Sequence, residues 1–261
     1  AIPQGTLKFL LIGAVIAIVL GLIVFAGTRP KPGESRSTQI LTYRGPYDSL
    51  ALARKGVQDY LNQKDVQASI NNWVLLNFAP LTVRNAGYLG PDLDGMYDAL
   101  AIRQALELGF RCFVFQIDYY EGPPKDSSLF VSPGEPCLLH RDNQGVLRSA
   151  NCGKINEMMK ALAESAFSSS LPTGNDPLIV ILFFKNTPDR IKSPKGYADF
   201  LSKVSEQLVP IQTSLLTTLG GSKFFGLQNQ NLLFTQNFQS LRGKTLLFTN
   251  ANTDGYGQTN R

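Results

Sequence analysis

Five polar side chains that can take part in acid–base or phosphate chemistry follow buried-strand patterns in this chain. They are Asp118, Glu121, His140, Lys185 and Asn186. In (β/α) barrels the chemistry lies at the carboxyl ends of the strands, so this placement predicts a site there. The chain contains one histidine, so a mechanism that needs two histidines, or a metal held by several imidazoles, is excluded within these residues. A lone strand-edge histidine in a purely structural role is the alternative for His140.

The elements that would position these side chains alternate along the sequence. Continuous or alternating apolar runs predict strands at Trp73–Leu76, Phe110–Asp118, Pro136–His140, Leu178–Phe184, Asn231–Thr235 and Thr245–Thr249. Apolar residues at helical spacing predict helices at Tyr47–Leu61, Met96–Leu108, Lys154–Phe167 and Tyr197–Leu219. Strands that alternate with helices are typical of an α/β fold with a parallel sheet, either a barrel or an open sheet.

The N-terminal part of the chain predicts a membrane anchor. Phe9–Thr28 carries no charge over twenty residues, and as a helix it would cover about 30 Å, the thickness of the hydrocarbon core. The alternative is a cleaved signal peptide with a site near Ala26. We therefore expect a single-pass transmembrane helix in residues 1–28, a linker in residues 29–46 and one folded domain in residues 47–261. Arg29, Lys31 and Arg36 place that domain on the cytoplasmic side.

The composition of the chain bears on its redox environment and on nucleic acid as a partner. The net charge is +5, but the basic residues are scattered, which argues against nucleic acid as a partner. Cys112, Cys137 and Cys152 make an odd number without C-x-x-C spacing, and no N-x-S/T sequon occurs. These features favour a reducing environment.

Five segments in order resemble the X region of phosphoinositide-specific phospholipase C. They are Ser69–Asn77, Ala105–Gly122, Cys137–Asn143, Asp176–Asn186 and Leu227–Asn250. The resemblance implies a TIM-type (β/α) barrel, and cleavage of a phosphodiester by the neighbouring inositol hydroxyl with two histidines and, in eukaryotic members, calcium. It ends at what looks like the fifth of eight strands, so the barrel would be partial in this sequence, and further chain or a partner would have to cover the opening.

The catalytic pair of that family is incomplete here. The resemblance places Asn71 where the family has its first catalytic histidine, and it places His140 at the second. An asparagine cannot transfer a proton near neutral pH, a contribution typically worth about 10²–10⁴ in rate.

The calcium ligands of the family are also altered. The resemblance retains Asn72 and Asp118, but it places Gln116 and Lys185 at two positions where the family has glutamate. Calcium needs six to eight oxygen ligands with several carboxylates, so no cofactor is expected. Lys185, with His140, is a candidate to bind phosphate in place of the metal. A salt bridge between Lys185 and Asp118 is the favoured alternative.

These substitutions predict a catalytically inactive, membrane-anchored domain with a structural or interaction role. Its partners would be the lipid bilayer and other proteins of a membrane-associated assembly, such as a virion with an internal membrane. One alternative is an active membrane-bound phosphodiesterase that cleaves inositol phospholipids and uses calcium. Another is lipid head-group binding without turnover.

Overall fold

The computed structural model describes residues 63–64, 69, 72–90, 95–119, 134–142, 144–171, 173–219, 222–223 and 231–253. The chain divides into two compact units, residues 1–45 and 46–261, and all described residues belong to the second. The expected transmembrane helix, the linker and the helix at Tyr47–Leu61 lie outside the described residues. Within the described ranges, no helix is both long enough and apolar enough to cross a membrane.

A five-stranded sheet forms the centre of the domain. Its parallel strands are β1 (Thr82–Val83), β4 (Cys112–Tyr119), β6 (Leu178–Phe184) and β9 (Thr245–Thr249), in that spatial order. A short strand, β5 (Pro136–Leu138), pairs with the end of β4 in the antiparallel direction. The α/β class with a parallel sheet is thus confirmed. Among the described strands β1 and β9 are not paired with each other, so no closed barrel is seen.

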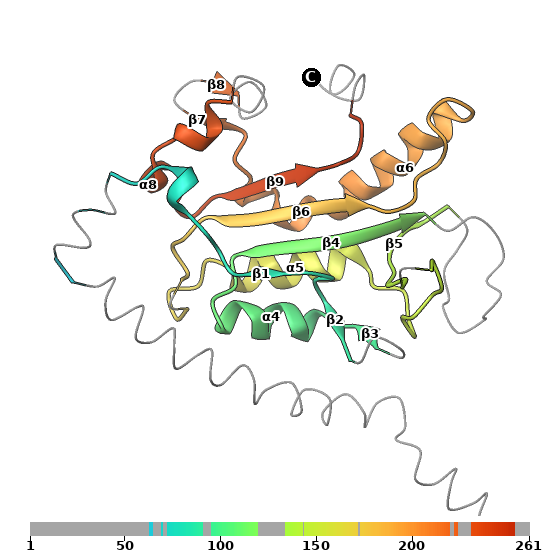
Figure 1. The fold of residues 1–261 in the computed structure, drawn as a ribbon, viewed down its shortest axis with the longest axis horizontal. Coiled ribbons are helices and arrows are strands. Elements are labelled where there is room, and N and C mark those ends of the chain that lie inside the picture. The colour runs from blue at the N-terminus through green and yellow to red at the C-terminus, as the bar shows by residue number, and fades with distance from the viewer. Residues whose placement is uncertain are drawn as a thin grey trace, which may run out of the picture. The chain divides into compact units, whose positions relative to one another are not determined.

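Three helices cover one face of this sheet. They are α4 (Ala99–Glu107), α5 (Ile155–Ser165) and α6 (Pro194–Gln207). Figure 1 shows α4 and α5 lying side by side along the sheet. Alternate strand residues point into this layer, and Phe113, Phe115 and Val180 are fully buried there. On the other face of β6, Ile179 and Ile181 are half-buried and Phe183 is exposed, so its apolar run extends beyond what the helices cover.

Helix boundaries follow local chemistry. The helix predicted at Met96–Leu108 begins later, at Ala99, because Met96–Tyr97 forms strand β3, which pairs with β2 (Tyr88–Leu89). Asp98 is the N-cap of the helix, and its carboxylate accepts the Leu100 N–H at 2.8 Å. Gly109, at φ 76°, ends the helix in the left-handed region as predicted.

The predicted helix at Tyr197–Leu219 is shorter than expected. It ends at Gln207 and continues as the 3₁₀ segment η2 (Val209–Ser214), followed by the small hairpin of β7 (Thr218–Leu219) and β8 (Ser222–Lys223). Pro210 cannot donate the amide bond that an α-helix would require at this point.

Two predicted strands are wrong. Trp73–Leu76 and Asn231–Thr235 run into the 3₁₀ turns η1 (Leu75–Asn77) and η3 (Leu233–Thr235), and the only strand-like pairing within these two described segments is the isolated bridge from Val74 to Asn237. The Asn77 side chain accepts the Val74 N–H at 3.0 Å and closes the first turn. With α8 (Phe238–Leu241), these turns pack Leu75, Leu233, Leu241 and Leu246 into a second apolar cluster. Short apolar runs do not distinguish strands from turns by periodicity.

Two of the three cysteines are joined. Cys137, on β5, forms a disulfide with Cys152, and Cys112 is free and buried. This pairing is not typical of a reducing environment, and the environment of the protein stays a prediction. The bond closes a loop that carries His140 and the residues around it.

Candidate functional site

Asp118 is the buried carboxylate at the carboxyl end of β4. Its side chain is 1% exposed. One carboxylate oxygen, Oδ2, accepts a hydrogen bond from Arg141 Nε at 2.6 Å, and Oδ1 accepts from Asn186 Nδ2 at 2.7 Å. The charge is therefore compensated by a guanidinium within the protein, and both oxygens are occupied.

Lys185 does not form the predicted salt bridge with Asp118. Its ammonium donates to the backbone oxygen of Arg141 at 3.0 Å and is otherwise exposed. Arg141 takes the position opposite the carboxylate because the planar guanidinium can donate to Asp118 through Nε and to the Gly145 carbonyl through Nη1. Sequence reasoning missed Arg141, although it directly follows His140.

His140 lies away from Asp118 along the sheet. Because β5 runs antiparallel to β4, with Cys137 opposite Asp118, the chain beyond Leu138 returns toward the middle of β4. There the His140 Nδ1 lies 3.1 Å from Asn85 Nδ2, and its ring lies 4.8 Å from the Tyr88 ring. The donor and acceptor roles in this hydrogen bond depend on the imidazole tautomer.

Asn85 is the residue that sequence reasoning missed beside the histidine. It follows β1 with φ 51°, and the next amide, Ala86 N–H, bonds to the Val114 oxygen at 2.9 Å. The resemblance placed the family's first-strand histidine and asparagine at Asn71 and Asn72, and the first strand was predicted at Trp73–Leu76. The structure places β1 at Thr82–Val83 instead, so Asn85 is the asparagine at the strand end.

The two asparagines assigned from the resemblance do not join this site. Asn71 lies outside the described residues. Asn72 is exposed next to Trp73, whose carbonyl accepts the Phe238 N–H at 2.8 Å just before β9 begins. Because the strands are parallel, this is the opposite edge of the sheet from Asp118. The proposed pairing of Asn72 with Asp118 as metal ligands is therefore not seen.

The remaining family position, Gln116, lies two residues before Asp118 on β4 and is half-buried. The alternation of a strand places both side chains on the face away from the three helices. Its Oε1 is buried without a hydrogen-bond partner among the described residues. One amide oxygen and one carboxylate do not fit a calcium ion, which takes six to eight oxygen ligands with several carboxylates among them. Within the described ranges, no three His, Cys, Asp or Glu side chains gather into a metal site.

The loop that carries His140 and Arg141 is held by several contacts. The His140 carbonyl accepts the Arg148 N–H at 2.8 Å, and Arg148 forms an ion pair with Asp142 at 2.6 Å. Burial alone would raise the pKa of Asp142, but hydrogen bonds from the Val146 and Gln144 amides and from Arg148 outweigh it and lower that pKa. The loop is thus built to present these side chains in a fixed arrangement.

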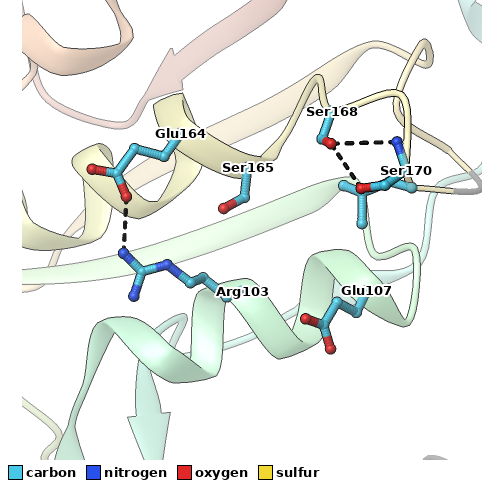
Figure 2. A pocket seen from close by; sticks show the side chains of 7 residues that line it. Arg103, Glu107, Glu164, Ser165, Ser168 and Ser170 are labelled. Carbon is cyan, nitrogen blue, oxygen red and sulfur yellow. Dashed lines mark hydrogen bonds and ion pairs between the residues drawn. The ribbon is translucent and has the colours of Figure 1, made fainter.

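A hollow lies between α4 and α5. Figure 2 shows Arg103 and Glu164 pointing toward each other across it, with an ion pair of 2.9 Å. Ser168 and Ser170 bond to each other at 2.8 Å at its other end. Glu107 and Ser165 complete the polar lining, and we assign no function to this hollow.

Comparison with known proteins adds a distant likeness of fold. No protein-family model matches the chain, and no curated protein matches it. The crystal structure of L. pealei PLC21 is 20% identical with a TM-score of 0.42, covering 68% of this chain and 19% of that one. The S. officinalis PLC21 structure is 19% identical with a TM-score of 0.39, covering 72% and 20%. The chain spans about a fifth of the length of these structures. The likeness assigns neither family membership nor activity.

Proposed function

We propose that this chain is a membrane-tethered, phospholipase C-like domain without phosphodiesterase activity, which serves a structural or interaction role at a membrane. The setting we propose is a membrane-associated protein assembly, such as a virion with an internal membrane. The uncharged segment Phe9–Thr28 supports the tether, and the five resembling segments support the family likeness.

The observation that carries the proposal is the state of Asp118. Each of its oxygens accepts one hydrogen bond, from Arg141 and from Asn186, so its negative charge is already compensated by a guanidinium of the protein. The only histidine has Asn85 as its neighbour, and an amide cannot share acid and base duties with it. Without a second proton-transfer group the chemistry would lose about 10²–10⁴ in rate.

An active phosphodiesterase is the second candidate, and one feature favours it. His140 and the cation Arg141 are consecutive, and the Lys185 ammonium lies 3.0 Å from the Arg141 carbonyl oxygen. The Arg141 and Lys185 cations could stabilise the charge of a phosphate without a metal, whereas the His140 ring lies against Asn85 and Tyr88. The same cations support a third role, the binding of a lipid head group without turnover.

Hydrolysis assays separate these functions. The full chain would be reconstituted in vesicles that contain phosphatidylinositol, and release of water-soluble inositol phosphate would be measured with calcium and with a chelator. We expect no release above that of the His140→Ala variant. Calcium-dependent turnover that disappears in His140→Ala would refute the proposal.

Head-group binding has its own control pair. Lys185→Ala removes the ammonium beside Arg141, whereas Lys192→Ala removes an ammonium from a side chain that is 85% exposed, in the same loop. Binding of soluble inositol phosphate that is weakened by the first change and unaffected by the second would support head-group recognition without turnover.

A further inference from the structure

Three large apolar side chains are exposed together on the short turns η1 and η3. Leu76 is 74% exposed, Leu232 is 43% exposed and Phe234 is 50% exposed. We call these three residues the apolar knob. The turns that carry them are joined by the bond from the Leu75 N–H to the Gln236 oxygen at 2.9 Å. Their inward neighbours are buried in the second apolar cluster, so the knob stands on a packed base.

The knob lies at the amino-terminal edge of the parallel sheet. The strand β9 begins just after α8, and the Gly243 N–H bonds to the Asn175 oxygen at 3.0 Å, close to the start of β6. Figure 1 shows η1 and α8 together at the end from which β6 and β9 start. Asp118 and Lys185 lie at the other ends of β4 and β6. The knob and the candidate site are therefore at opposite edges.

Two basic residues and a tryptophan belong to the same end of the domain as the apolar knob. Arg242 and Lys244, which follow α8, are exposed. The one tryptophan of the chain, Trp73, is half-buried, with its ring 6.4 Å from that of Phe238. Apolar side chains with a tryptophan beside them and basic residues around them are typical of surfaces that enter the interface of an anionic bilayer.

We infer that the apolar knob docks this domain onto an anionic lipid surface, with the amino-terminal edge of the sheet toward the bilayer. A stable protein interface needs about 800 Å² on each partner, far more than three side chains supply. A tethered domain needs less, because the anchor of the proposed function keeps the knob at high local concentration beside the lipid. Arg242 and Lys244 complement the negative charge of such a surface.

The inference rests on the proposed anchor and adds an orientation to it. With the knob in the bilayer interface, the edge that carries Asp118 and Lys185 faces away from the membrane. Lipids of the same bilayer cannot then reach His140. The site is presented instead to soluble ligands or to neighbouring proteins of the assembly.

Trp73 makes the orientation measurable in the full chain. The chain would be reconstituted in phosphatidylcholine–phosphatidylserine vesicles in which part of the lipid carries bromine on its acyl chains, and tryptophan fluorescence would be recorded. We expect the brominated lipid to quench Trp73. In the double variant Trp73→Phe, Ile191→Trp, the only tryptophan moves to the loop after β6, where Ile191 is 88% exposed, and we expect no quenching.

Matched surface variants test the knob itself. Leu76→Ser with Phe234→Ser should abolish most of the quenching of Trp73, whereas Ile191→Ser should leave it unchanged. Quenching that persists without the knob would overturn the inference. So would a Trp73 that is shielded from both brominated lipid and aqueous acrylamide, because a protein or a second copy would then cover the knob.

Failure of the inference is distinguishable from failure of the proposed function. Extraction of the vesicles with alkaline carbonate removes proteins that lack a transmembrane anchor. A chain that resists extraction while Trp73 is not quenched refutes only the docking. A chain that is released refutes the tether and the docking that rests on it.

Discussion

The ion pair between Arg141 and Asp118 makes a sharp prediction about stability. Arg141→Ala leaves a carboxylate that is 1% exposed with Asn186 as its one remaining partner among the described residues. Removing one partner of a buried pair typically costs about 3–5 kcal/mol. The Arg141 side chain is 22% exposed, so water can partly replace it, and we expect the lower end of that range, about 3 kcal/mol.

Thermal unfolding of the full chain in detergent micelles, followed by circular dichroism, would measure this loss. For a domain of this size, about 3 kcal/mol lowers Tm by roughly 6–12 °C. The matched control is Arg148→Ala in the same loop, where the two side chains of the pair with Asp142 are 30% and 24% exposed, so solvent screens the pair and the loss should be clearly smaller. Adding Asp118→Asn to Arg141→Ala removes the uncompensated charge and should restore much of the loss.

Two results would refute this reasoning. If Arg141→Ala costs no more than Arg148→Ala, the Asp118 carboxylate is not held by the guanidinium in solution. If Asp118→Asn deepens the loss in the Arg141→Ala background, the buried charge is not the source of the cost. In either case Asp118 would again be a candidate base or metal ligand, and the argument against activity would lose its main support.

Further predictions concern three other features. Burial lowers the pKa of Arg111 to about 10, an effect that Asp176 partly offsets, and the guanidinium donates to three backbone carbonyls. Arg111→Met should therefore lower the free energy of unfolding in urea by at least about 3 kcal/mol. The control Arg103→Met, at an exposed ion pair, should lower it by under about 1 kcal/mol. Reduction of the disulfide, whose cysteines are 15 residues apart, should destabilise the domain by about 3 kcal/mol, and an unchanged Tm in reductant would contradict the pairing. The pKa of Asp142 is lower in the folded state than its unfolded value of 3.8, so the ionised carboxylate stabilises the fold above pH 3.8. This stabilisation is lost as the pH falls through the folded-state pKa. Asp142→Asn should therefore make the free energy of unfolding less dependent on pH in this acid range. If the free energy of unfolding falls with pH in Asp142→Asn as it does in the unaltered chain, the contacts of Asp142 in the loop do not contribute to stability.

The sequence determined the framework of this domain. The uninterrupted run Leu178–Phe184 predicted β6 with its bounds, and Thr245–Thr249 predicted β9, because short apolar runs rich in branched and aromatic residues are typical of strands. The apolar face of Lys154–Phe167 likewise predicted α5. The sequence also showed that one histidine is present, which limits acid–base chemistry without any structure.

Tertiary structure decided which residues meet. A strand of two residues such as Thr82–Val83 has no periodic signal and exists only because β4 pairs with it, so Asn85 could not be identified beside His140 from the sequence. The antiparallel direction of β5 took His140 away from the edge where parallel strands would have placed it. Long-range contacts of this kind, including Arg141 on Asp118, depend on strand direction and side-chain reach. The local pattern of residues predicts neither the direction of a strand nor the contacts of a long side chain, because both depend on how the sheet assembles.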